Sequence, residues 1–416
     1  MRIQLIPNFV TAALLSLSAY GCAATPAALE QTITLDAHNP LAVSRKGEQT
    51  LIPLALLNLA DDTNNSTYVA QINGSFAPSQ LVDTDADGQQ DSLLLITDYA
   101  PNAKVRIHVS TLKGGKLNPQ YTPLTQAEMG VRVGGKKVGE TWQGGEYQQV
   151  NELTNPASHT IGDKLYKYEG FGWESDLMAY RFYFDERGLI DIFGKRTPDL
   201  VLHEVGLDGG DYHAMSDWGM DVLKVGPSLG LAGIAAWQNE AIQPIQNVDS
   251  LSVKLQSGPL HSHATVEQTG WKLGEQVIDL RRRHSINAHS HLTYVQAFTN
   301  QEIPQLAVGI VKHNVEKLSY LNKQSEWLYL ATFGEQSLAD DQLGMAIFFR
   351  ASDLHKVTED KLNELAVLNA GKNLDFYFAA RWAGEASPIT TKQQFLDYLE
   401  TTRQALNNPI KVTRAK

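Results

Sequence analysis

The chain has 416 residues, of which 43% are hydrophobic and 19% are charged, and its formal net charge is −11. This composition is typical of a globular protein with one large domain or two ordinary ones. The negative charge argues against a nucleic-acid partner, because such proteins present a basic face to the phosphates. It does not exclude an anionic substrate, since a local cluster of cations can reverse the field inside a cleft.

Residues 1–24 predict an export signal. Arg2 precedes the apolar run TAALLSLSA, and small residues follow it. The run is too short to stay in a bilayer as a spanning helix. Cys22, the only cysteine, ends this segment, which indicates either lipidation at Cys22 or simple cleavage after Ala23 or Ala24. We therefore expect an exported protein, either periplasmic or attached to the outer membrane through an N-terminal lipid.

Most of the chain shows strand patterns. Residues 25–130 predict a small β-sandwich, in which Val105, Ile107 and Val109 alternate with polar residues. A Gly-rich connection over 134–147 leads to residues 150–416, whose nine or more strand patterns predict a large antiparallel β-sandwich. We expect the fold to be mostly β and the large sandwich to carry the site.

Two segments favour surface helices. One runs from Thr358 to Leu368, and the other follows Thr391, which forms a capping box with Gln394.

Residues 83–91 resemble a calcium loop. Asp83, Asp85, Asp87 and Asp91 can offer oxygen ligands to one cation, and Gly88 allows a sharp turn. The late Glu of an EF-hand is missing, and the alternative is a solvated Asp-rich turn. Any calcium here would be structural, because the chemistry inferred below requires no cofactor.

The histidine pairs in HSH (261–263) and HSINAHSH (284–291) permit two interpretations. Residues two apart in a strand face the same side, so two strands can supply several zinc ligands. The alternative is that these residues are outward-facing polar positions of a sheet.

The densest concentration of aromatic, acidic, basic and Gly residues runs from residue 173 to residue 230. Aromatic faces beside carboxylates, His and Arg are typical of clefts that bind sugars. Within it, His213 can transfer protons near neutral pH, and Tyr212 can do so if neighbouring cations such as Arg181 lower its pKa. The alternative is a structured loop in which both side chains only pack.

The strand pattern YRFYFD places Tyr180, Phe182 and Phe184 on one face and Arg181, Tyr183 and Asp185 on the other. Arg181 can bind a uronate carboxylate in a bidentate fork. The alternative is an ion pair between Arg181 and Asp185.

The segments YRFYFDERGLIDIFGK, DYHAMSDWGMDVLKVGPSLGLAG, AVGIVKH and DTDADGQQDSL resemble a secreted bacterial family catalogued as a domain of unknown function. Its members lie among genes for degrading uronic-acid polysaccharides such as ulvan, alginate and pectin. The resemblance implies a β-sandwich similar to the galactose-mutarotase-like supersandwich and a role on anionic oligosaccharides, as a lyase or dehydratase.

Our leading hypothesis is β-elimination on uronic-acid oligosaccharides, giving 4,5-unsaturated uronates, with the dehydratase variant slightly favoured. This reaction needs a cation for the carboxylate, a base for the C5 proton and an acid for the leaving oxygen. The candidates are His213, Tyr212, Tyr180 and His313 for catalysis and Arg181, Lys224, Trp173, Trp218, Asp217 and Asp221 for substrate binding.

Two alternatives remain open. A glycoside hydrolase can draw a carboxylate pair from Glu174, Asp176, Asp217 and Asp221. A non-catalytic, surface-anchored glycan-binding lipoprotein is consistent with Cys22 and with the 7 Trp and 15 Tyr residues.

Overall fold

The computed structural model describes residues 29–57, 67–112, 121–207 and 211–416. The predicted export signal and Cys22 lie outside the described residues. No helix in the described part of the chain is long and apolar enough to span a membrane.

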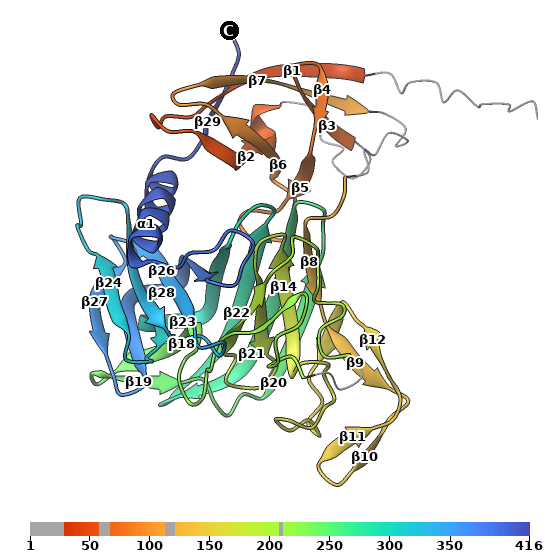
Figure 1. Ribbon diagram of the computed structural model, residues 1–416, viewed down its shortest axis with the longest axis vertical. Coiled ribbons are helices and arrows are strands. Elements are labelled where there is room, and N and C mark those ends of the chain that lie inside the picture. The colour runs from red at the N-terminus through yellow and green to blue at the C-terminus, as the bar shows by residue number, and fades with distance from the viewer. Residues whose placement is uncertain (1–28, 58–66, 113–120, 208–210) are drawn as a thin grey trace, which may run out of the picture.

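The described chain forms two β-sandwiches, a small one above a large one (Figure 1). The fold is therefore mostly β and antiparallel, as the alternating sequence patterns predicted. The small sandwich pairs a five-stranded sheet with a three-stranded one. The first has the order β29 (Lys411–Arg414), β1 (Leu29–His38), β7 (Lys104–Leu112), β3 (Thr67–Ile72), β4 (Ser75–Ala77), and the second β2 (Arg45–Pro53), β6 (Ser92–Tyr99), β5 (Ser79–Val82).

The small sandwich takes its last strand from the end of the chain. β29 pairs with β1, with Leu35 opposite Arg414 and His38 opposite Lys411. Alternate residues of β7 point inward, so that Ile107 and Val109 are fully buried. The described residues of the small sandwich are thus 29–57, 67–112 and 411–414, and the large sandwich begins at residue 125.

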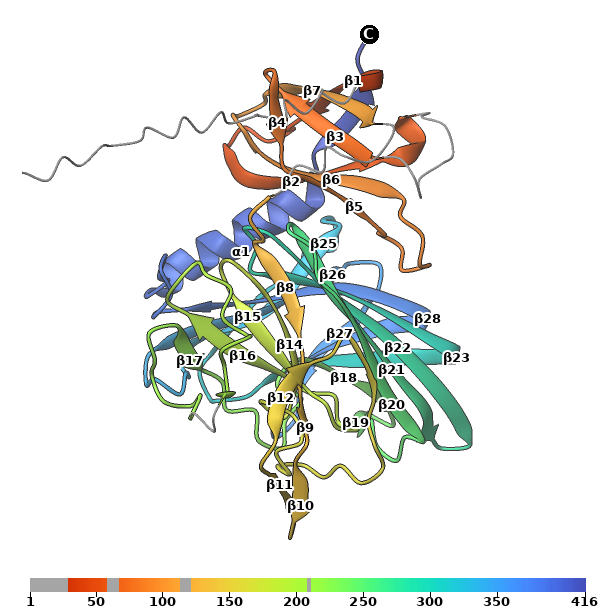
Figure 2. The ribbon, with the colours of Figure 1, turned by 90° about the vertical axis from the view of Figure 1, so that its right-hand side faces the viewer.

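The large sandwich packs a five-stranded sheet against a twelve-stranded sheet, seen from the side in Figure 2. The five-stranded sheet has the order β17 (Gly219–Asp221), β16 (Ile190–Lys195), β15 (Ala179–Tyr183), β14 (Gly170–Ser175), β8 (Thr125–Glu128). The main path of the larger sheet is β13 (Glu152–Thr154), β20 (Ser250–Gln256), β21 (His261–Leu273), β22 (Gln276–Asn287), β23 (Leu292–Val311), β28 (Asn363–Trp382), β26 (Gln342–Arg350), β25 (Trp327–Glu335), β24 (Glu316–Tyr320). Off this path, β18 (Leu231–Gln238) joins β23 and β19 (Ala241–Pro244), and β27 (Leu354–Glu359) joins β28.

A two-hairpin arm extends from the large sandwich. It consists of β9 (Gly130–Val133) with β12 (Glu146–Gln149), and β10 (Lys136–Val138) with β11 (Thr141–Gln143). Its glycines mark tight turns: a Cβ on Gly145 would lie only 2.2 Å from the carbonyl oxygen of Val133. The Gly-rich connection of the sequence is therefore two hairpins.

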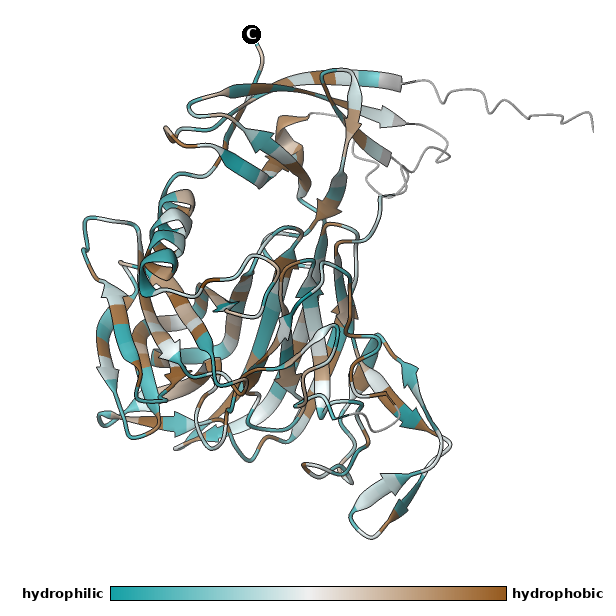
Figure 3. Ribbon diagram, in the orientation of Figure 1, coloured by the Kyte–Doolittle hydropathy of each residue, from teal (hydrophilic) through white to brown (hydrophobic). Residues whose placement is uncertain are grey.

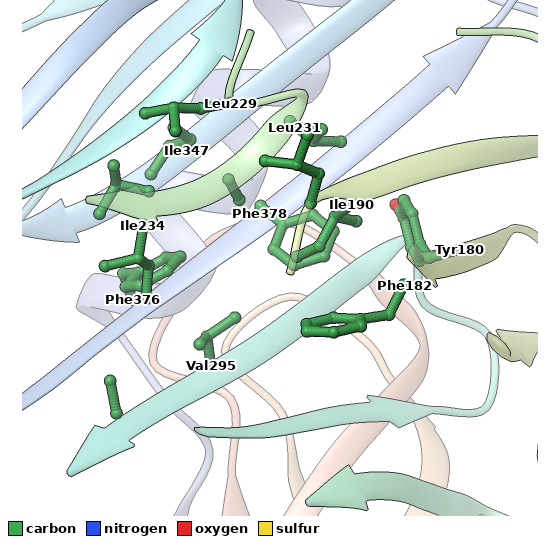
Figure 4. Packing of buried hydrophobic residues seen from close by; sticks show 14 of the residues in the cluster. Tyr180, Phe182, Ile190, Leu229, Leu231, Ile234, Val295, Ile347, Phe376 and Phe378 are labelled. Carbon is green, nitrogen blue, oxygen red and sulfur yellow. The ribbon is translucent and has the colours of Figure 1, made fainter. Parts of the chain in front are cut away.

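The two sheets of the large sandwich enclose its main hydrophobic core (Figure 4), and hydrophobic and hydrophilic residues alternate along many of their strands (Figure 3). Tyr180 and Trp173 are both 0% exposed within this core. The Tyr180 hydroxyl donates to the backbone oxygen of His291 (2.6 Å) and accepts from the backbone nitrogen of Ala380 (3.0 Å). Neither ring can reach a substrate in this structure, so the expected catalytic role of Tyr180 and binding role of Trp173 are corrected to core packing.

The two expected helices have different outcomes. The second is confirmed as α1 (Lys392–Asn407), with the capping box of Thr391 and Gln394, and it packs Phe395 and Leu399 against the large sheet. The helix expected over Thr358–Leu368 is wrong, because these residues end β27 and begin β28. Residues 363–368 are buried at every position, and a strand buried on both faces shows no alternation that would identify it.

The core position of Trp173 yields a stability prediction. Its indole nitrogen donates to Oγ1 of Thr293 across the two sheets (2.8 Å). We expect Trp173→Phe to lower the free energy of unfolding by about 1–3 kcal/mol, because it loses this bond and leaves a cavity. Denaturant unfolding measures the change. The half-buried Trp218→Phe is the matched control and should cost clearly less; equal costs would contradict the core assignment.

Candidate active site

The outer face of the five-stranded sheet carries charged side chains that are buried. Arg181 and Asp191 alternate with the core residues of β15 and β16, and all of these charged groups are less than 10% exposed. They form three ionic groups, Lys167 with Glu128, Lys195 with Glu174, and Arg181 with Asp191 and Asp221. Residues 196–207 and 211–218 are the cover segment, which packs Val201 and Leu202 over this face.

The cover segment is held through Glu174. One oxygen of Glu174 accepts the backbone N–H groups of Val201 (2.8 Å) and Leu202 (2.7 Å), and the other lies 2.7 Å from the ammonium of Lys195. Both charged side chains are fully buried. Glu174 is thus a structural anchor for the cover segment, and it cannot serve as the carboxylate of a hydrolase.

Arg181 is shared by two carboxylates. Its Nη2 contacts Asp191, Oδ2 of Asp221 (2.8 Å) and the Tyr183 hydroxyl (2.6 Å). One guanidinium facing two aspartates leaves an excess negative charge in a buried place. Burial, and then repulsion from Asp191, raise the pKa of Asp221 well above its ordinary value. The expected carboxylate clamp, and the alternative pair of Arg181 with Asp185, are both corrected, because Arg181 is 0% exposed and held by Asp191 and Asp221.

Tyr212 and His213 lie directly above this cluster. The guanidinium carbon of Arg181 is 5.2 Å from the ring centroid of Tyr212, and the backbone N–H of Asp221 donates to the Tyr212 carbonyl (2.8 Å). Nε2 of His213 lies 3.5 Å from Oδ2 of Asp221, and its Nδ1 lies 3.2 Å from the exposed Asp211. The Tyr212 and His213 rings are 4.5 Å apart between centroids. The structure therefore brings together Tyr212, His213, Asp221 and Arg181.

Burial raises the pKa of Tyr212, and the nearby charge of Arg181 opposes this only in part. The expectation that cations lower this pKa is therefore corrected. A phenol that keeps its proton suits the role of an acid rather than that of a base.

Tyr212 lines a cleft of about 760 Å³ between the cover segment and the arm. Trp142 and Tyr147 contribute aromatic surface, and Glu169 and Lys164 contribute charges. Lys164 forms no ion pair with any residue that the structure describes, whereas all three polar groups of the Arg132 guanidinium donate to Lys164, Gly144 or Tyr147. The volume and the mixture of aromatic and polar groups are suitable for a short oligosaccharide.

Four of the predicted residues lie away from this cleft. Lys224 is exposed, and its backbone oxygen lies 2.9 Å from Nε2 of His313, so these two residues share a different loop region. Asp217 is exposed, and Trp218 packs its ring 5.9 Å from that of Phe193. The residues that line the cleft include none of these four. His213 is not among them either, but its ring lies 4.5 Å from that of Tyr212, which is.

The Asp-rich loop folds partly as the sequence suggests. Carboxylate oxygens of Asp83, Asp85 and Asp91 lie within 4.8 Å of one another, and Asp87 is outside this group. Asp83 also forms a 3.0 Å ion pair with Arg283 of the large sheet. Structural calcium at this loop stays a prediction. Among the described residues, the histidine pairs do not form a comparable cluster, so the structure gives no support to the zinc interpretation.

The sequence reasoning missed three residues of this region. Asp191 sits directly opposite Arg181 in the register of β15 and β16, so the alternation in GLIDIFGK contained the signal for it. Glu169 and Lys164 have positive φ angles of 63° and 62°, a strained conformation that no sequence pattern revealed.

These features define a two-sandwich β protein with a polar cleft beside a buried ionic cluster. The chain belongs to the family described as "Domain of unknown function (DUF4861)", whose model matches residues 37–412. A relative from Formosa agariphila, named "Uncharacterized protein P7", is 22% identical over 364 residues, covering 80% of this chain and 81% of the relative.

Solved structures resemble the chain more remotely. A protein of glycosyl hydrolase family 38 and an α-mannosidase, both from Enterococcus faecalis, each show a TM-score of 0.47 and 9% identity over 92% of this chain. The chain spans about half the length of these proteins (47% and 46%). A likeness at this level indicates nothing about activity.

The raised pKa of Asp221 predicts a pH-dependent stability. A carboxyl group whose folded pKa exceeds its unfolded value stabilises the fold below about pH 4, and this stabilisation is lost as the pH rises through the folded pKa, at roughly 1.4 kcal/mol per pKa unit. Asp221→Asn mimics the protonated form. We therefore expect the variant's melting temperature, relative to the parent's, to increase between pH 4 and pH 8 in scanning calorimetry.

The exposed Asp217→Asn serves as the control and should show no such trend. A constant or decreasing difference for Asp221→Asn would show that this carboxyl group is not the one that prefers its proton.

Proposed function

We propose that this protein is an exported enzyme that performs β-elimination on uronic-acid oligosaccharides, removing the substituent at C4. The observation that carries the proposal is the pairing of two proton carriers beside the cleft. Tyr212 lines the cleft as a neutral phenol, and the imidazole of His213 lies 4.5 Å away between ring centroids. In the proposed complex the two adjacent rings face the same side of the sugar, and the proton and the leaving group are lost from that face.

The roles follow from the surroundings of each residue. Nδ1 of His213 is hydrogen-bonded to the exposed Asp211 (3.2 Å), and its Nε2 lies 3.5 Å from the buried Asp221. The His213 side chain is 54% exposed, so a ligand can take the place of Asp211 at this ring. In the proposed step His213 takes the C5 proton, and the C–H electrons form the C4=C5 bond. The C4–O bond breaks, and Tyr212 protonates the leaving oxygen. The reaction leaves a 4,5-unsaturated uronate. The group released from C4 is water for a dehydratase or a sugar for a lyase, and short substrates favour the dehydratase.

The substrate carboxylate needs a positive partner to acidify the C5 proton. Lys164 takes this role in place of Arg181 and Lys224, because it lines the cleft and forms no ion pair in the described chain. The ligand is then an acidic oligosaccharide, and no cofactor takes part.

The test uses ulvan, alginate and pectin oligosaccharides, followed by mass spectrometry and ultraviolet absorbance. A product lighter by one water with new absorbance indicates a dehydratase, and chain cleavage with absorbance indicates a lyase. New reducing ends without absorbance would instead establish hydrolysis. An unchanged mass on every acidic glycan would leave glycan binding as the remaining function.

Variants locate the reaction. We expect Tyr212→Phe and His213→Asn each to lower kcat by about 10²–10⁴-fold, the usual contribution of a positioned acid or base. Tyr320→Phe and His355→Gln, at positions outside the lining of the cleft, are matched controls and should keep the parent rate. Elimination at the parent rate in both site variants would show that the chemistry takes place elsewhere.

A further inference from the structure

A second cleft, of about 520 Å³, lies between the small sandwich and the outer face of the twelve-stranded sheet. We call it the interdomain cleft. β2 forms one wall, the turn after β22 and the neighbouring strands form the floor, and α1 closes one side. The Tyr212 cleft lies beside the outer face of the other sheet, so the two clefts are on opposite faces of the large sandwich.

A histidine with a fixed orientation lines this cleft. The backbone N–H of His289 donates to Oδ1 of Asp176 (2.7 Å), and Nδ1 of His289 lies 2.7 Å from Oδ2 of the same carboxylate. Asp176 comes from the turn between β14 and β15 and is 7% exposed. A carboxylate on Nδ1 fixes the ring and directs Nε2 away from it. The side chain of His289 stays 41% exposed, so Nε2 is within reach of a ligand.

The backbone at His289 is held under strain. Its φ angle is +58°, which a residue with a side chain seldom adopts, and such strain concentrates at ligand sites. Gly47 of β2 packs directly on it: a Cβ on Gly47 would lie 3.0 Å from the Cβ of His289. The hydrogen bond to Asp176 raises the pKa of His289.

The floor of the cleft holds an unpartnered polar group. Ser285 is 5% exposed, and its hydroxyl has no partner among the described residues. A buried hydroxyl without a hydrogen bond costs about 1–3 kcal/mol, which a ligand can recover. Ser285 lies opposite Tyr294, and Tyr294 opposite Tyr377, whose ring stacks on it at 4.5 Å. The cleft thus combines aromatic surface with polar groups, as saccharide sites do.

We propose that the interdomain cleft is a second saccharide-binding site, in which Nε2 of His289 and the hydroxyl of Ser285 hydrogen-bond the hydroxyl groups of one sugar unit. Lys46 lines the same cleft, is exposed and has no ion pair in the described chain. It adds an interaction with a carboxylate where the sugar is acidic. This site goes beyond the elimination chemistry and does not require it.

The experiment is calorimetric titration of the full chain carrying both Tyr212→Phe and His213→Asn, which prevents turnover. The probes are trigalacturonate, an acidic sugar, and cellotriose, a neutral one. We expect His289→Gln to weaken binding in the interdomain cleft by about tenfold or more for both probes, because one hydrogen bond to a fixed imidazole is lost. Lys46→Met should weaken only the acidic probe. His355→Gln, on the exposed edge strand β27, is the matched control and should bind as the parent does.

The Ser285→Ala variant tests the site even if the His289 variant loses its fold. The Ser285 hydroxyl makes no hydrogen bond within the described chain that the substitution would break. We expect this variant to weaken the binding of both probes by about threefold to tenfold, at a melting temperature that is unchanged or higher because an unpartnered buried hydroxyl is removed. ¹⁵N spectra of histidine-labelled protein supply a readout that a structural role would not move, since the Nε2 resonance of His289 should shift on adding either probe.

The outcomes separate the two proposals. The second site is overturned if the His289 and Ser285 variants bind the probes with unchanged affinity. It is also overturned if neither probe binds. Binding that depends on His289 while the Tyr212 variants lose no elimination activity would sustain the second site and remove the Tyr212 cleft from the proposed function.

Discussion

The candidate active site depends on charges that are buried rather than exposed. Arg181, Asp191 and Asp221 lie together on the outer face of the five-stranded sheet, where each is no more than 1% exposed. Taking such groups out of water costs several kcal/mol per ion unless each finds an opposite charge. Asp191 meets this requirement for Arg181. Asp221, in β17 at the end of the cover segment, adds a second carboxyl group, and burial and repulsion from Asp191 raise its pKa. The same strand then fixes Tyr212, whose carbonyl accepts the N–H of Asp221.

Both sheets of the large sandwich have covered outer faces, and each cover produces a cleft. The cover segment and the arm enclose the Tyr212 cleft, whereas the small sandwich and α1 enclose the interdomain cleft. Loops and domain boundaries are the usual places for binding sites, because the rigid strands beneath hold the side chains in position. The small sandwich is itself tied to the large one at several points. Arg283 contacts Asp83, and Asn287 donates to Gln49.

Strand alternation made much of the fold predictable. The same alternation already argued against placing Tyr180 and Arg181 in one site. The pattern YRFYFD placed Tyr180 and Arg181 on opposite faces, so both could not serve one site. In the structure Tyr180 is in the core and Arg181 is under the cover segment. Contacts between distant residues were beyond the reach of any local pattern. Asp176 and His289 are separated by 113 residues, and only the packing of the two sheets brings them together. The first residues of β28 were predicted wrongly as a helix for a different reason. They are buried at every position, so they lack the alternation that a strand normally shows.

The assignment of acid and base at the Tyr212 cleft follows from burial more than from residue type. Tyr and His can each act in either direction, and the sequence left both open for the base. Desolvation disfavours the phenolate of Tyr212, and the charge of Arg181 is already shared by two carboxylates, which limits how far it can compensate. The proton therefore stays on Tyr212, and the half-exposed His213 is left to accept one. In the elimination proposed above, a carboxylate–guanidinium cluster that contacts no substrate would thus determine which of two adjacent side chains acts as the acid.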